Sequence, residues 1–438
     1  MSSRATTSRR GFLKGTLAAG AACAFPYVVP ASALGRDGAV APSNRLAMGV
    51  IGCGGRGFSD LNWLLHEDGV RFVAVCDVQR AKRDRAKDAV DKAYGSADCA
   101  TFRDFREMLE ARKEIDALVI ATGDRWHALA AMTCMRAGKD VYCEKPGILT
   151  IAEGQALIQA EKETGRIYQT GAQRASESNF IYMGELVRQG KLGKVHTVRA
   201  HLGYLPAWPR VNAALPAEPL PPRDELDWDL WLGPCPARPY NSAFLRPWPV
   251  PGWYTQYDFA GGIPQWGSHT ILQCQLDLGL ADTSAVEYEY PADLTRDGMT
   301  IRFANGLKLV AQLGGWRGSC GVRYEGDEGW TACADGYERP DVSSPKLLEG
   351  FVETVKAYTE RTGRPRNHVL DFLQSVRTRK PARTPATVAY RTMTTNLAMD
   401  LCLDLKRNLK WDPAKVEFVG DDEANARRSR AMRAPWHV

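Results

Sequence analysis

A glycine-rich turn between an apolar run and a segment of helical periodicity constrains the fold of this chain most. The apolar run, 46–51, reads LAMGVI, and the turn, 52–57, reads GCGGRG. Apolar residues then recur at helical spacing between positions 58 and 65. This order predicts a strand, a tight turn and a helix whose N-terminus receives the phosphates of a dinucleotide. Such a unit is typical of a doubly wound parallel sheet, the Rossmann fold.

The glycines of the turn have separate expected roles. Gly52 makes the bend, Gly54 lets the backbone approach a pyrophosphate, and Gly57 lets the helix pack against the strand. The residues of this turn that are predicted to bind the cofactor are Gly52, Gly54, Gly55, Arg56 and Gly57.

An acid follows the turn at the spacing of a ribose-binding residue. The next apolar run ends in Asp77, about 20 residues beyond the last glycine. A carboxylate there accepts hydrogen bonds from the adenosine ribose and repels a 2′-phosphate, so the sequence predicts NAD. Arg80 and Lys82 follow closely, which leaves NADP possible.

Strands and helices continue to alternate after Asp77. Helices are expected over 81–94, 102–112 and 128–137, with a buried strand over 116–121. Alternation of this kind predicts a parallel sheet with right-handed crossovers. Ligands bind such sheets at the carboxyl ends of the strands, so Thr122 and the pair Glu144-Lys145 are predicted to face the cofactor.

The second half of the chain predicts an α+β domain with a large, open, mostly antiparallel sheet. Strand-like runs at 299–304 and 307–311 meet at Asn305-Gly306, and this dipeptide is a strong hairpin signal. Residues 206–251 are rich in proline and tryptophan without a period, which indicates a functional loop or a packing arm.

The first 33 residues have the layout of a twin-arginine signal peptide. Residues 8–14 read SRRGFLK, a weakly apolar stretch covers 15–29, and 31–33 form a small-residue cleavage site. The stretch is shorter than the roughly 20 residues that a membrane span needs, so we expect a cleaved signal and no stable membrane anchor. Because this route exports folded proteins, the sequence predicts a periplasmic protein with a tightly bound cofactor. The alternative is a frayed basic terminus without a targeting role.

Four segments are therefore expected: a signal peptide 1–33, a dinucleotide-binding domain 44–170, a substrate-binding domain 171–420 and a tail 421–438. The formal charge of +6 is scattered, whereas nucleic acid requires a clustered basic face. The eleven cysteines include no CxxC pair, and the seven histidines show no metal-ligand spacing. We expect no nucleic-acid partner, no metal site and no obligatory disulfide.

With Glu144-Lys145-Pro146 downstream of the glycine turn and Asp77, the chain resembles the Gfo/Idh/MocA oxidoreductase family, and most of all its exported twin-arginine branch. The resemblance runs from about residue 45 to residue 435. It includes DRWH at 124–127, GAQR at 171–174, WDLWLG at 228–233, WGSH at 266–269 and LKWDP at 409–413. It implies a sugar, polyol or glycoside as substrate and a homodimer or homotetramer.

The resemblance also implies roles for single side chains. Lys145 is expected beside the nicotinamide, where burial and the cationic ring disfavour its ammonium form and make it a general base. The alternative is a surface lysine paired with Glu144. His269 is expected to shuttle the hydroxyl proton, or else to be a structural histidine. Gln265 stands where the family carries an acid, so it orients a hydroxyl but cannot ionise. The remaining predicted site residues are Trp126 and His127 at the cofactor, and Arg174 and Tyr257 at the substrate.

The leading hypothesis is an NAD-dependent oxidoreductase that moves a hydride between a secondary hydroxyl of a carbohydrate and a retained cofactor. One alternative is a sugar–sugar oxidoreductase that alternates substrates. Another is a glycoside-cleaving enzyme that oxidises a ring hydroxyl, eliminates the aglycone and reduces the ketone again. A third is a non-catalytic, dinucleotide-gated sugar sensor. The aromatic residues Trp248, Trp253 and Tyr254 are expected to stack on a sugar ring or simply to fill space.

Overall fold

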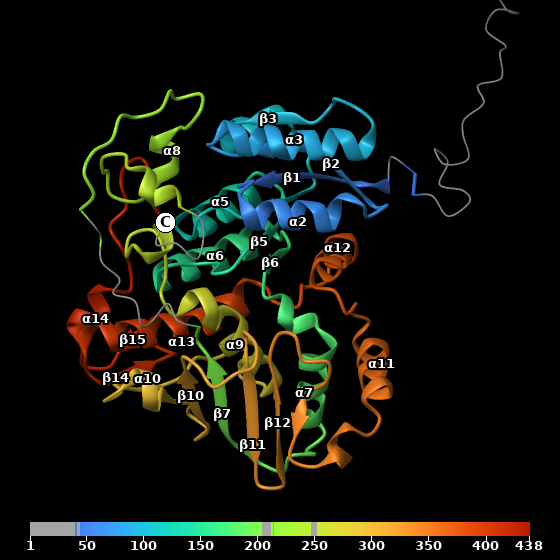
Figure 1. Ribbon diagram of the computed structural model, residues 1–438, viewed down its shortest axis with the longest axis vertical. Coiled ribbons are helices and arrows are strands. Elements are labelled where there is room, and N and C mark those ends of the chain that lie inside the picture. Colours follow the sequence, from blue (N-terminus) through green and yellow to red (C-terminus); the bar gives the residue numbers. More distant parts are fainter. Residues whose placement is uncertain (1–39, 42–43, 204–211, 213, 247–251) are drawn as a thin grey trace, which may run out of the picture. The chain divides into compact units, whose positions relative to one another are not determined.

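The first sheet of the computed structural model is parallel throughout (Figure 1). Within the described residues it has six strands in the order β3-β2-β1-β4-β5-β6. Their bounds are β1 (Leu46–Ile51), β2 (Val70–Cys76), β3 (Ala100–Phe102), β4 (Ala117–Ile120), β5 (Asp140–Cys143) and β6 (Tyr168–Thr170). The strand order reverses between β1 and β4, and ligands bind such sheets at that point.

The structure describes residues 40–41, 44–203, 212, 214–246 and 252–438. The predicted signal peptide 1–33 and Trp248 lie outside the described residues. Residues 46–438 form one compact unit.

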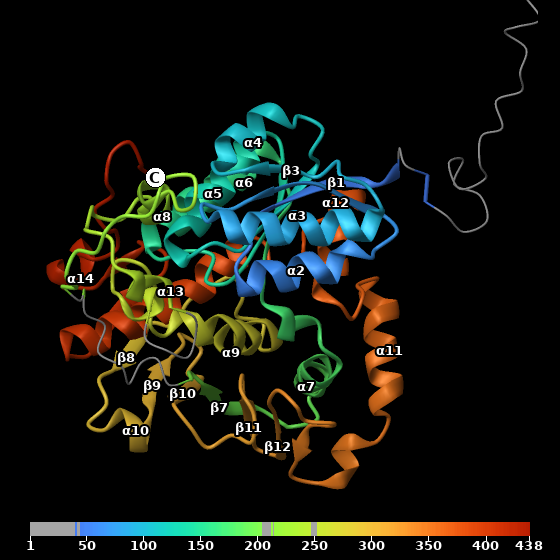
Figure 2. The ribbon, with the colours of Figure 1, turned by 45° about the horizontal axis from the view of Figure 1, so that its top comes forward.

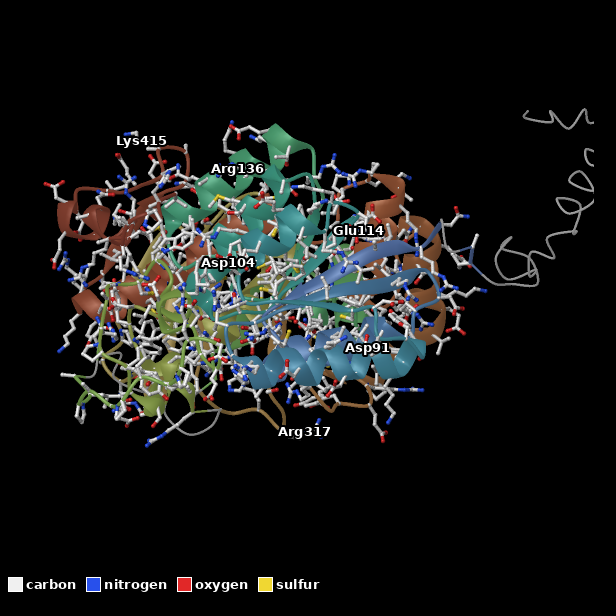
Figure 3. The ribbon with its side chains drawn as sticks, turned by 90° about the horizontal axis from the view of Figure 1, so that it is seen from above. Asp91, Asp104, Glu114, Arg136, Arg317 and Lys415 are labelled. Atoms are coloured by element: carbon white, nitrogen blue, oxygen red, sulfur yellow. The ribbon has the colours of Figure 1, made fainter. Side chains whose placement is uncertain are left out.

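Helices cover both faces of this sheet, as predicted. They are α2 (Gly55–Leu65), α3 (Arg80–Tyr94), α4 (Phe105–Ala111), α5 (Asp124–Arg136) and α6 (Ile151–Thr164). In Figure 3, α3, which carries Asp91, and α5, which carries Arg136, lie on opposite sides of the sheet. The fully buried strand β4 contributes side chains to the cores on both faces of the sheet, because alternate side chains point in opposite directions. Ala117 and Val119 belong to the core with α2 and α3, whereas Leu118 and Ile120 belong to the core with α4 and α5.

One helix on this sheet comes from late in the chain. The buried face of α12 (His368–Thr378) joins the core of α2 and α3. The ring of Phe372 lies 5.8 Å from that of Tyr142 on β5, and Arg379 Nη1 lies 2.6 Å from Asp140 Oδ2. The predicted domain boundary at residue 170 stays a prediction. Helix α12, which follows that boundary in the sequence, packs against the first sheet.

The second sheet is mixed and mostly antiparallel, as predicted. Within the described residues it has nine strands in the order β13-β12-β11-β7-β10-β9-β8-β14-β15, and among these β7 and β10 pair in parallel. The bounds are β7 (Val195–His201), β8 (Glu287–Glu289), β9 (Met299–Arg302), β10 (Lys308–Gln312), β11 (Val322–Gly326), β12 (Gly329–Cys333), β13 (Asp341–Val342), β14 (Leu409–Asp412) and β15 (Glu417–Phe418). The expected hairpin at Asn305-Gly306 is confirmed, because β9 and β10 pair around it and Gly306 has a φ of +86°.

Helices α7 (Ser178–Arg188), α9 (Pro264–Asp277) and α13 (Ala386–Leu405) pack against the second sheet (Figure 2). Helix α13 contacts both α9 and α6, so it connects the two domains. The remaining helical segments are η3 (Gln173–Ser176), α8 (Trp228–Leu232), η5 (Ser242–Leu245), η6 (Trp253–Thr255), α10 (Leu294–Asp297), η7 (Pro345–Leu348), α11 (Phe351–Thr362) and α14 (Asp422–Ala426).

The C-terminal tail packs back on the first domain and on α8. The rings of Trp436 and Trp126 meet edge to face at 4.8 Å, and Arg433 Nη1 lies 2.5 Å from Asp229 Oδ1. Ten cysteines lie in the described part of the chain, and all of them are buried and unpaired. Among the helices that the structure describes, none has the length and apolar character that a membrane crossing requires.

Candidate active site

The turn after β1 has the geometry that its glycines predict. Gly52 has a φ of +89°, a conformation that side chains other than glycine rarely adopt. A Cβ on Gly57 would lie 1.8 Å from the carbonyl oxygen of Gly52, so only glycine lets α2 pack this closely. Helix α2 starts after Gly54 without a side-chain cap, and nothing lies within 4 Å of a Cβ placed on Gly55. The open helix N-terminus therefore fits a pyrophosphate.

Asp77 lies at the end of β2, beside this turn. Its Oδ2 accepts a hydrogen bond from the backbone N–H of Cys53 at 2.7 Å, and its Oδ1 accepts one from Gln79 at 2.8 Å. Arg80 forms an ion pair with Asp224, whereas Lys82 lines the same cavity as Asp77. The acid is held where a ribose would follow the pyrophosphate.

These groups line a cavity of about 790 Å³ between the carboxyl ends of the parallel strands and the start of α9. The predicted site residues on its wall are Gly52, Gly54, Gly55, Arg56, Asp77, Thr122, Trp126, His127, Glu144, Lys145 and Gln265. Gly57, Arg174, Tyr257 and His269 are not on its wall. Trp253 and Tyr254 do line it, next to Leu230 and Trp231 of α8.

Lys145 connects the first domain to α9. Its Nζ donates a hydrogen bond to the backbone oxygen of Gln265 at 3.0 Å. The carboxylate of Glu144 is engaged elsewhere, because Arg56 Nε lies 3.0 Å from its Oε1 and Gln173 Nε2 donates to the same oxygen at 2.6 Å. The Lys145 ammonium is thus directed toward the second domain and not toward its sequence neighbour.

His269 lies one turn after Gln265 on α9 and is buried. Burial lowers the pKa of His269 well below its usual range, and the positive charges of Lys145 and Arg174 add to this effect. Its Nδ1 is shielded from solvent and has no hydrogen-bond partner among the described residues. These effects keep the imidazole neutral and make it a weak base, so it can form a hydrogen bond through a ring nitrogen but resists taking up a proton.

Asp124 is a carboxyl of this site that the sequence interpretation missed. It begins α5, and its Oδ2 accepts hydrogen bonds from the side-chain amide of Gln265 and, at 3.4 Å, from the backbone N–H of Gly261. Burial raises the pKa of Asp124 to about 7, while the positive charge of Lys145 opposes this shift. The available signal was the DRWH segment, but a helix start at residue 128 left Asp124 in a loop.

The residues after Asp124 shape the cavity wall. Trp126 Nε1 donates to the carbonyl of Leu230 at 2.8 Å. His127 Nδ1 lies 2.7 Å from the carbonyl oxygen of Pro146, and burial lowers the pKa of His127. The two ring nitrogens of His127 lie near the carbonyl oxygens of Pro146 and Thr122, so this side chain holds the segment after β5 close to the start of α5.

A second missed residue is the neighbouring Arg125. Its Nε donates to the carbonyl of Trp231 at 2.8 Å, and its guanidinium lies 4.0 Å from the centroid of that indole ring. Burial lowers the pKa of Arg125 to about 10. Arg125 thus connects α5 to α8, and it forms part of the cavity wall.

Two residues predicted to contact substrate are engaged by other protein groups. Arg174 makes a bidentate pair with Asp335, with distances of 2.8 Å from Nε to Oδ1 and 2.6 Å from Nη2 to Oδ2. The carbonyl of Tyr257 accepts from Arg430 Nη1 at 2.6 Å, and the Arg430 guanidinium lies 4.2 Å from the centroid of its ring. Their roles toward substrate stay predictions.

A parallel sheet with a glycine turn, an acid at the end of β2 and a second domain over the cavity define a two-domain, NAD-binding protein. Two family models together match almost all of the described chain. The oxidoreductase family model for the NAD-binding Rossmann fold matches residues 46–172, and the family's C-terminal alpha/beta domain matches 183–438. This chain belongs to the Gfo/Idh/MocA oxidoreductase family. A model of the twin-arginine translocation signal sequence matches residues 6–26.

Curated relatives match over part of their length. Inositol 2-dehydrogenase 2 of Saccharopolyspora erythraea is 34% identical over 167 residues, which are 37% of this chain and 47% of that protein. Glycosyl hydrolase family 109 protein 1 of a Shewanella species is 31% identical over 210 residues, which are 43% of this chain and 44% of that protein. The chain therefore spans less than half the length of these relatives.

Solved structures share the fold over nearly their whole length. The WlbA dehydrogenase of Bordetella pertussis, crystallised with NADH and UDP-GlcNAcA, has a TM-score of 0.59 at 18% identity and covers 84% of this chain and 98% of its own. Myo-inositol 2-dehydrogenase of Lactobacillus plantarum has a TM-score of 0.56 at 16% identity, with 84% and 99% covered. At this identity the likeness concerns the fold.

Proposed function

We propose that this protein transfers a hydride between a secondary hydroxyl of a sugar, polyol or glycoside and a tightly bound NAD. The observation that carries the proposal is the meeting of Lys145 Nζ with the start of α9, on the wall of the cavity that also contains the glycine turn. The inositol dehydrogenases among the relatives support a polyhydroxylated substrate. When bound, the nicotinamide supplies the hydride acceptor.

The chain's own residues handle the proton in this proposal. Lys145, in its neutral amine form, accepts the proton of the substrate hydroxyl and becomes an ammonium, and loss of the hydride from the same carbon to the nicotinamide leaves a ketone. His269 stays neutral and positions the hydroxyl through a hydrogen bond. Gln265 cannot ionise, and its amide is held by Asp124, so the titratable carboxyl nearest to Gln265 comes from the first domain.

Removal of the Lys145 amine tests this proposal. Lys145→Ala is expected to lower turnover by about 10²–10⁴-fold, the usual contribution of a general base. NAD binding, measured by isothermal titration calorimetry, should persist, because the turn and Asp77 remain. Lys162→Ala, an exposed lysine on α6, is the matched control and should keep wild-type turnover. Undiminished turnover of Lys145→Ala would remove this lysine from the mechanism.

Glycoside cleavage through oxidation, elimination and reduction is a second candidate function. The family 109 glycosyl hydrolases among the relatives favour it, and so does Gln265 in the place of an acid. This reaction regenerates its cofactor in each cycle. Cleavage of aryl glycosides without added NAD would therefore support it, whereas strict dependence on added NAD or on a second carbonyl substrate would favour net oxidation. Ligand-dependent binding of a partner protein without any turnover would favour the sensor.

We also propose that the protein is periplasmic and acts as a homo-oligomer. The twin-arginine signal match supports export of a folded, cofactor-loaded chain. One face of the second sheet carries charged cross-strand pairs, including Arg199 with Glu325 and Arg302 with Glu289, both at 3.1 Å. Native mass spectrometry of the exported protein would measure the retained nucleotide and the oligomer size in one experiment. A monomer would contradict the homo-oligomer, absence of nucleotide would contradict export with a bound cofactor, and recovery of the protein outside the periplasmic fraction would contradict the location.

A further inference from the structure

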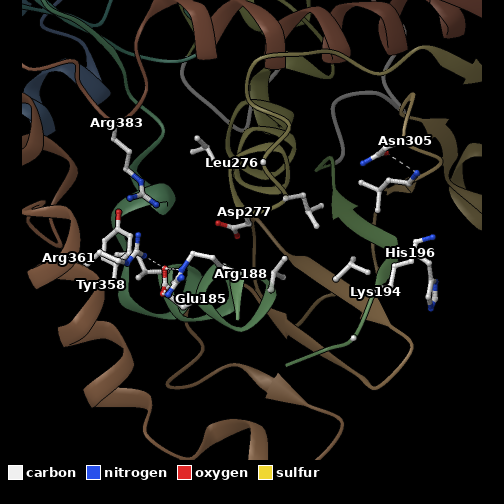
Figure 4. Close-up of a pocket in the computed structure, with 18 of the residues that line it drawn as sticks. Glu185, Arg188, Lys194, His196, Leu276, Asp277, Asn305, Tyr358, Arg361 and Arg383 are labelled. Atoms are coloured by element: carbon white, nitrogen blue, oxygen red, sulfur yellow. Dashed lines mark hydrogen bonds and ion pairs between the residues drawn. The ribbon is translucent and has the colours of Figure 1, made fainter. Parts of the chain in front are cut away.

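A second large cavity lies in the second domain, beside α7 and the end of α9, and shares no lining residue with the dinucleotide cavity. Its volume of about 970 Å³ is within the range of small-molecule sites, which is roughly 300–1,000 Å³. Its walls come from the C-terminal ends of α7 and α9, the start of β7, the turn at Asn305-Gly306 and a segment from Tyr358 to Arg383 (Figure 4). The proposed reaction makes no use of this cavity.

Positive charge predominates on the wall of this cavity. Among the described lining residues, the cationic side chains are Arg188, Lys194, Arg361, Arg364 and Arg383, and the carboxylates are Glu185 and Asp277. Buried Glu185 is bound by Arg361 and, at 2.5 Å, by Arg188, while Arg364 Nη1 lies 2.7 Å from Asp371 Oδ1. Carboxylates therefore hold three of the arginines at the wall, and the cavity keeps an excess of positive charge.

Arg383 is the arginine of this wall that has no carboxylate partner among the described residues. Its guanidinium makes no hydrogen bond or ion pair with the described residues, and its Nε is shielded from solvent. It lies over the ring of Tyr358, 5.2 Å from the centroid, which fixes its plane. Burial lowers the pKa of Arg383 to about 10, so it remains charged at neutral pH. Buried charges and buried N–H groups in native proteins almost always have partners, so this one indicates an anion that enters from the cavity.

Asp277, near Arg383 in Figure 4, does not neutralise it. Its Oδ2 accepts from Tyr324 OH at 2.6 Å and from Gln273 Nε2 at 2.7 Å, and it forms no ion pair with a described residue. Burial raises the pKa of Asp277 to about 7. Near neutral pH a large fraction of this carboxyl is protonated, and in that form it can donate to an anionic oxygen.

We propose that this cavity is a binding site for a small organic molecule with a phosphate or carboxylate group, whose oxygens accept hydrogen bonds from Arg383. A planar guanidinium suits both groups, because it donates two parallel N–H bonds to paired oxygens. Exposed Lys194 on the opposite side and Arg361 add to the positive field.

Inorganic phosphate and citrate are the probes that test this site. The wild-type protein is titrated by isothermal titration calorimetry in the presence of saturating NAD, which fills the pyrophosphate-binding turn, at constant ionic strength set with chloride. At least one probe should bind with a saturable, one-to-one isotherm. Binding of phosphate alone would assign a phosphorylated ligand, and binding of citrate alone a carboxylate. Absence of binding by both probes would overturn the proposal.

Three variants locate the binding. Arg383→Met should lower the affinity for the probe at least tenfold, while the NAD affinity and turnover of the variant stay at the wild-type level. A failure of this anion site can therefore be distinguished from a failure of the proposed function. Arg296→Met, on exposed α10 and outside both cavities, makes the same charge change and should bind the probe like the wild type. Lys194→Ala replaces an exposed side chain and should weaken the probe at least threefold, even if Arg383→Met does not fold. Unchanged probe affinity in Lys194→Ala or in folded Arg383→Met would contradict the site.

Discussion

Gln265 and Asp124 form a hydrogen-bonded pair between the two domains, and Lys145 donates to the backbone of the same glutamine. The pair lies in a buried setting where Asp124 ionises only with difficulty. In this chain the titratable carboxyl next to Gln265 is therefore contributed by α5 and not by α9. An amide at position 265 is compatible with the site because it has both a donor for Asp124 and an acceptor for a hydroxyl.

Asp124 is expected to make stability depend on pH. Its pKa is about 7 in the folded protein and near 3.8 when unfolded, so between these values the folded state retains a proton that the unfolded chain has lost. This group therefore makes the free energy of unfolding fall as pH rises from about 4 to 7. Asp124→Asn removes this pH dependence. The free energy of unfolding of the variant minus that of the wild type should therefore increase as pH rises from about 4 to 7. Urea unfolding at pH 5 and pH 7.5 measures the difference, and a constant difference would contradict the assignment.

Asp77 is expected to select the cofactor. Asp77→Ala removes a charged acceptor for the ribose hydroxyls, and such hydrogen bonds contribute about 1.5–3 kcal/mol. The Kd for NAD should rise about 10–100-fold, and the Kd for NADP should rise less, because the repulsion of its 2′-phosphate disappears as well. Calorimetric titration with both nucleotides measures this. Equal weakening would mean that the substitution acts through the hydrogen bond to Cys53 and distorts the turn.

At the scale of elements, the turn before α2 depends on one very close approach. Gly57→Ala would place a Cβ 1.8 Å from the oxygen of Gly52 and should cost at least about 1–3 kcal/mol of stability by overpacking. Gly55→Ala, two residues away, meets no atom within 4 Å and should stay within about 0.5 kcal/mol of wild type. Unfolding of both variants without nucleotide measures the contrast. Similar stabilities would show that α2 shifts freely on β1.

Helix α12 is expected to stabilise the parallel sheet. Phe372 is fully buried against Tyr142, so Phe372→Ala should lower the free energy of unfolding by about 3–5 kcal/mol. Val352→Ala on α11 truncates a side chain that is 63% exposed and should change it by less than about 0.5 kcal/mol. Chemical denaturation followed by tryptophan fluorescence provides both values. A small effect of Phe372→Ala would mean that the sheet is stable without α12.

The sequence predicted the local units well, because each depends on short-range patterns. The turn at 52–57, the alternation around β4 and the hairpin at Asn305-Gly306 all follow from period and glycine position. The tertiary partner of a helix could not be predicted in this way, because the apolar face of α12 does not indicate which of the two sheets it packs against. The site shows the same limit: Lys145 and Gln265 were predicted, but the contact of Asp124 with Gln265 joins residues 141 positions apart.

At the scale of the whole molecule, the cysteines of the described residues are unpaired thiols that are buried in the core. Burial raises the pKa of Cys99 to about 11, and the other nine cysteines of the described chain are buried as well. For the chain without the predicted signal peptide 1–33, which contains Cys23, we expect Ellman's reagent to label fewer than one thiol per folded chain within minutes and all ten after unfolding in guanidinium. The melting temperature should be the same with and without reductant. Rapid labelling of the folded protein, or destabilisation by reductant, would contradict this.

The late position of α12 also bears on how the protein is made. Gln169 at the end of the parallel sheet donates to the backbone of His368, which lies 199 positions further along the chain. While the ribosome is still adding the second half, the sheet face that carries α2 and α3 lacks α12, so its β5 and β6 side is only partly covered. The first half alone is therefore expected to bind a nucleotide weakly. Binding of the dinucleotide is expected to follow the end of polypeptide synthesis.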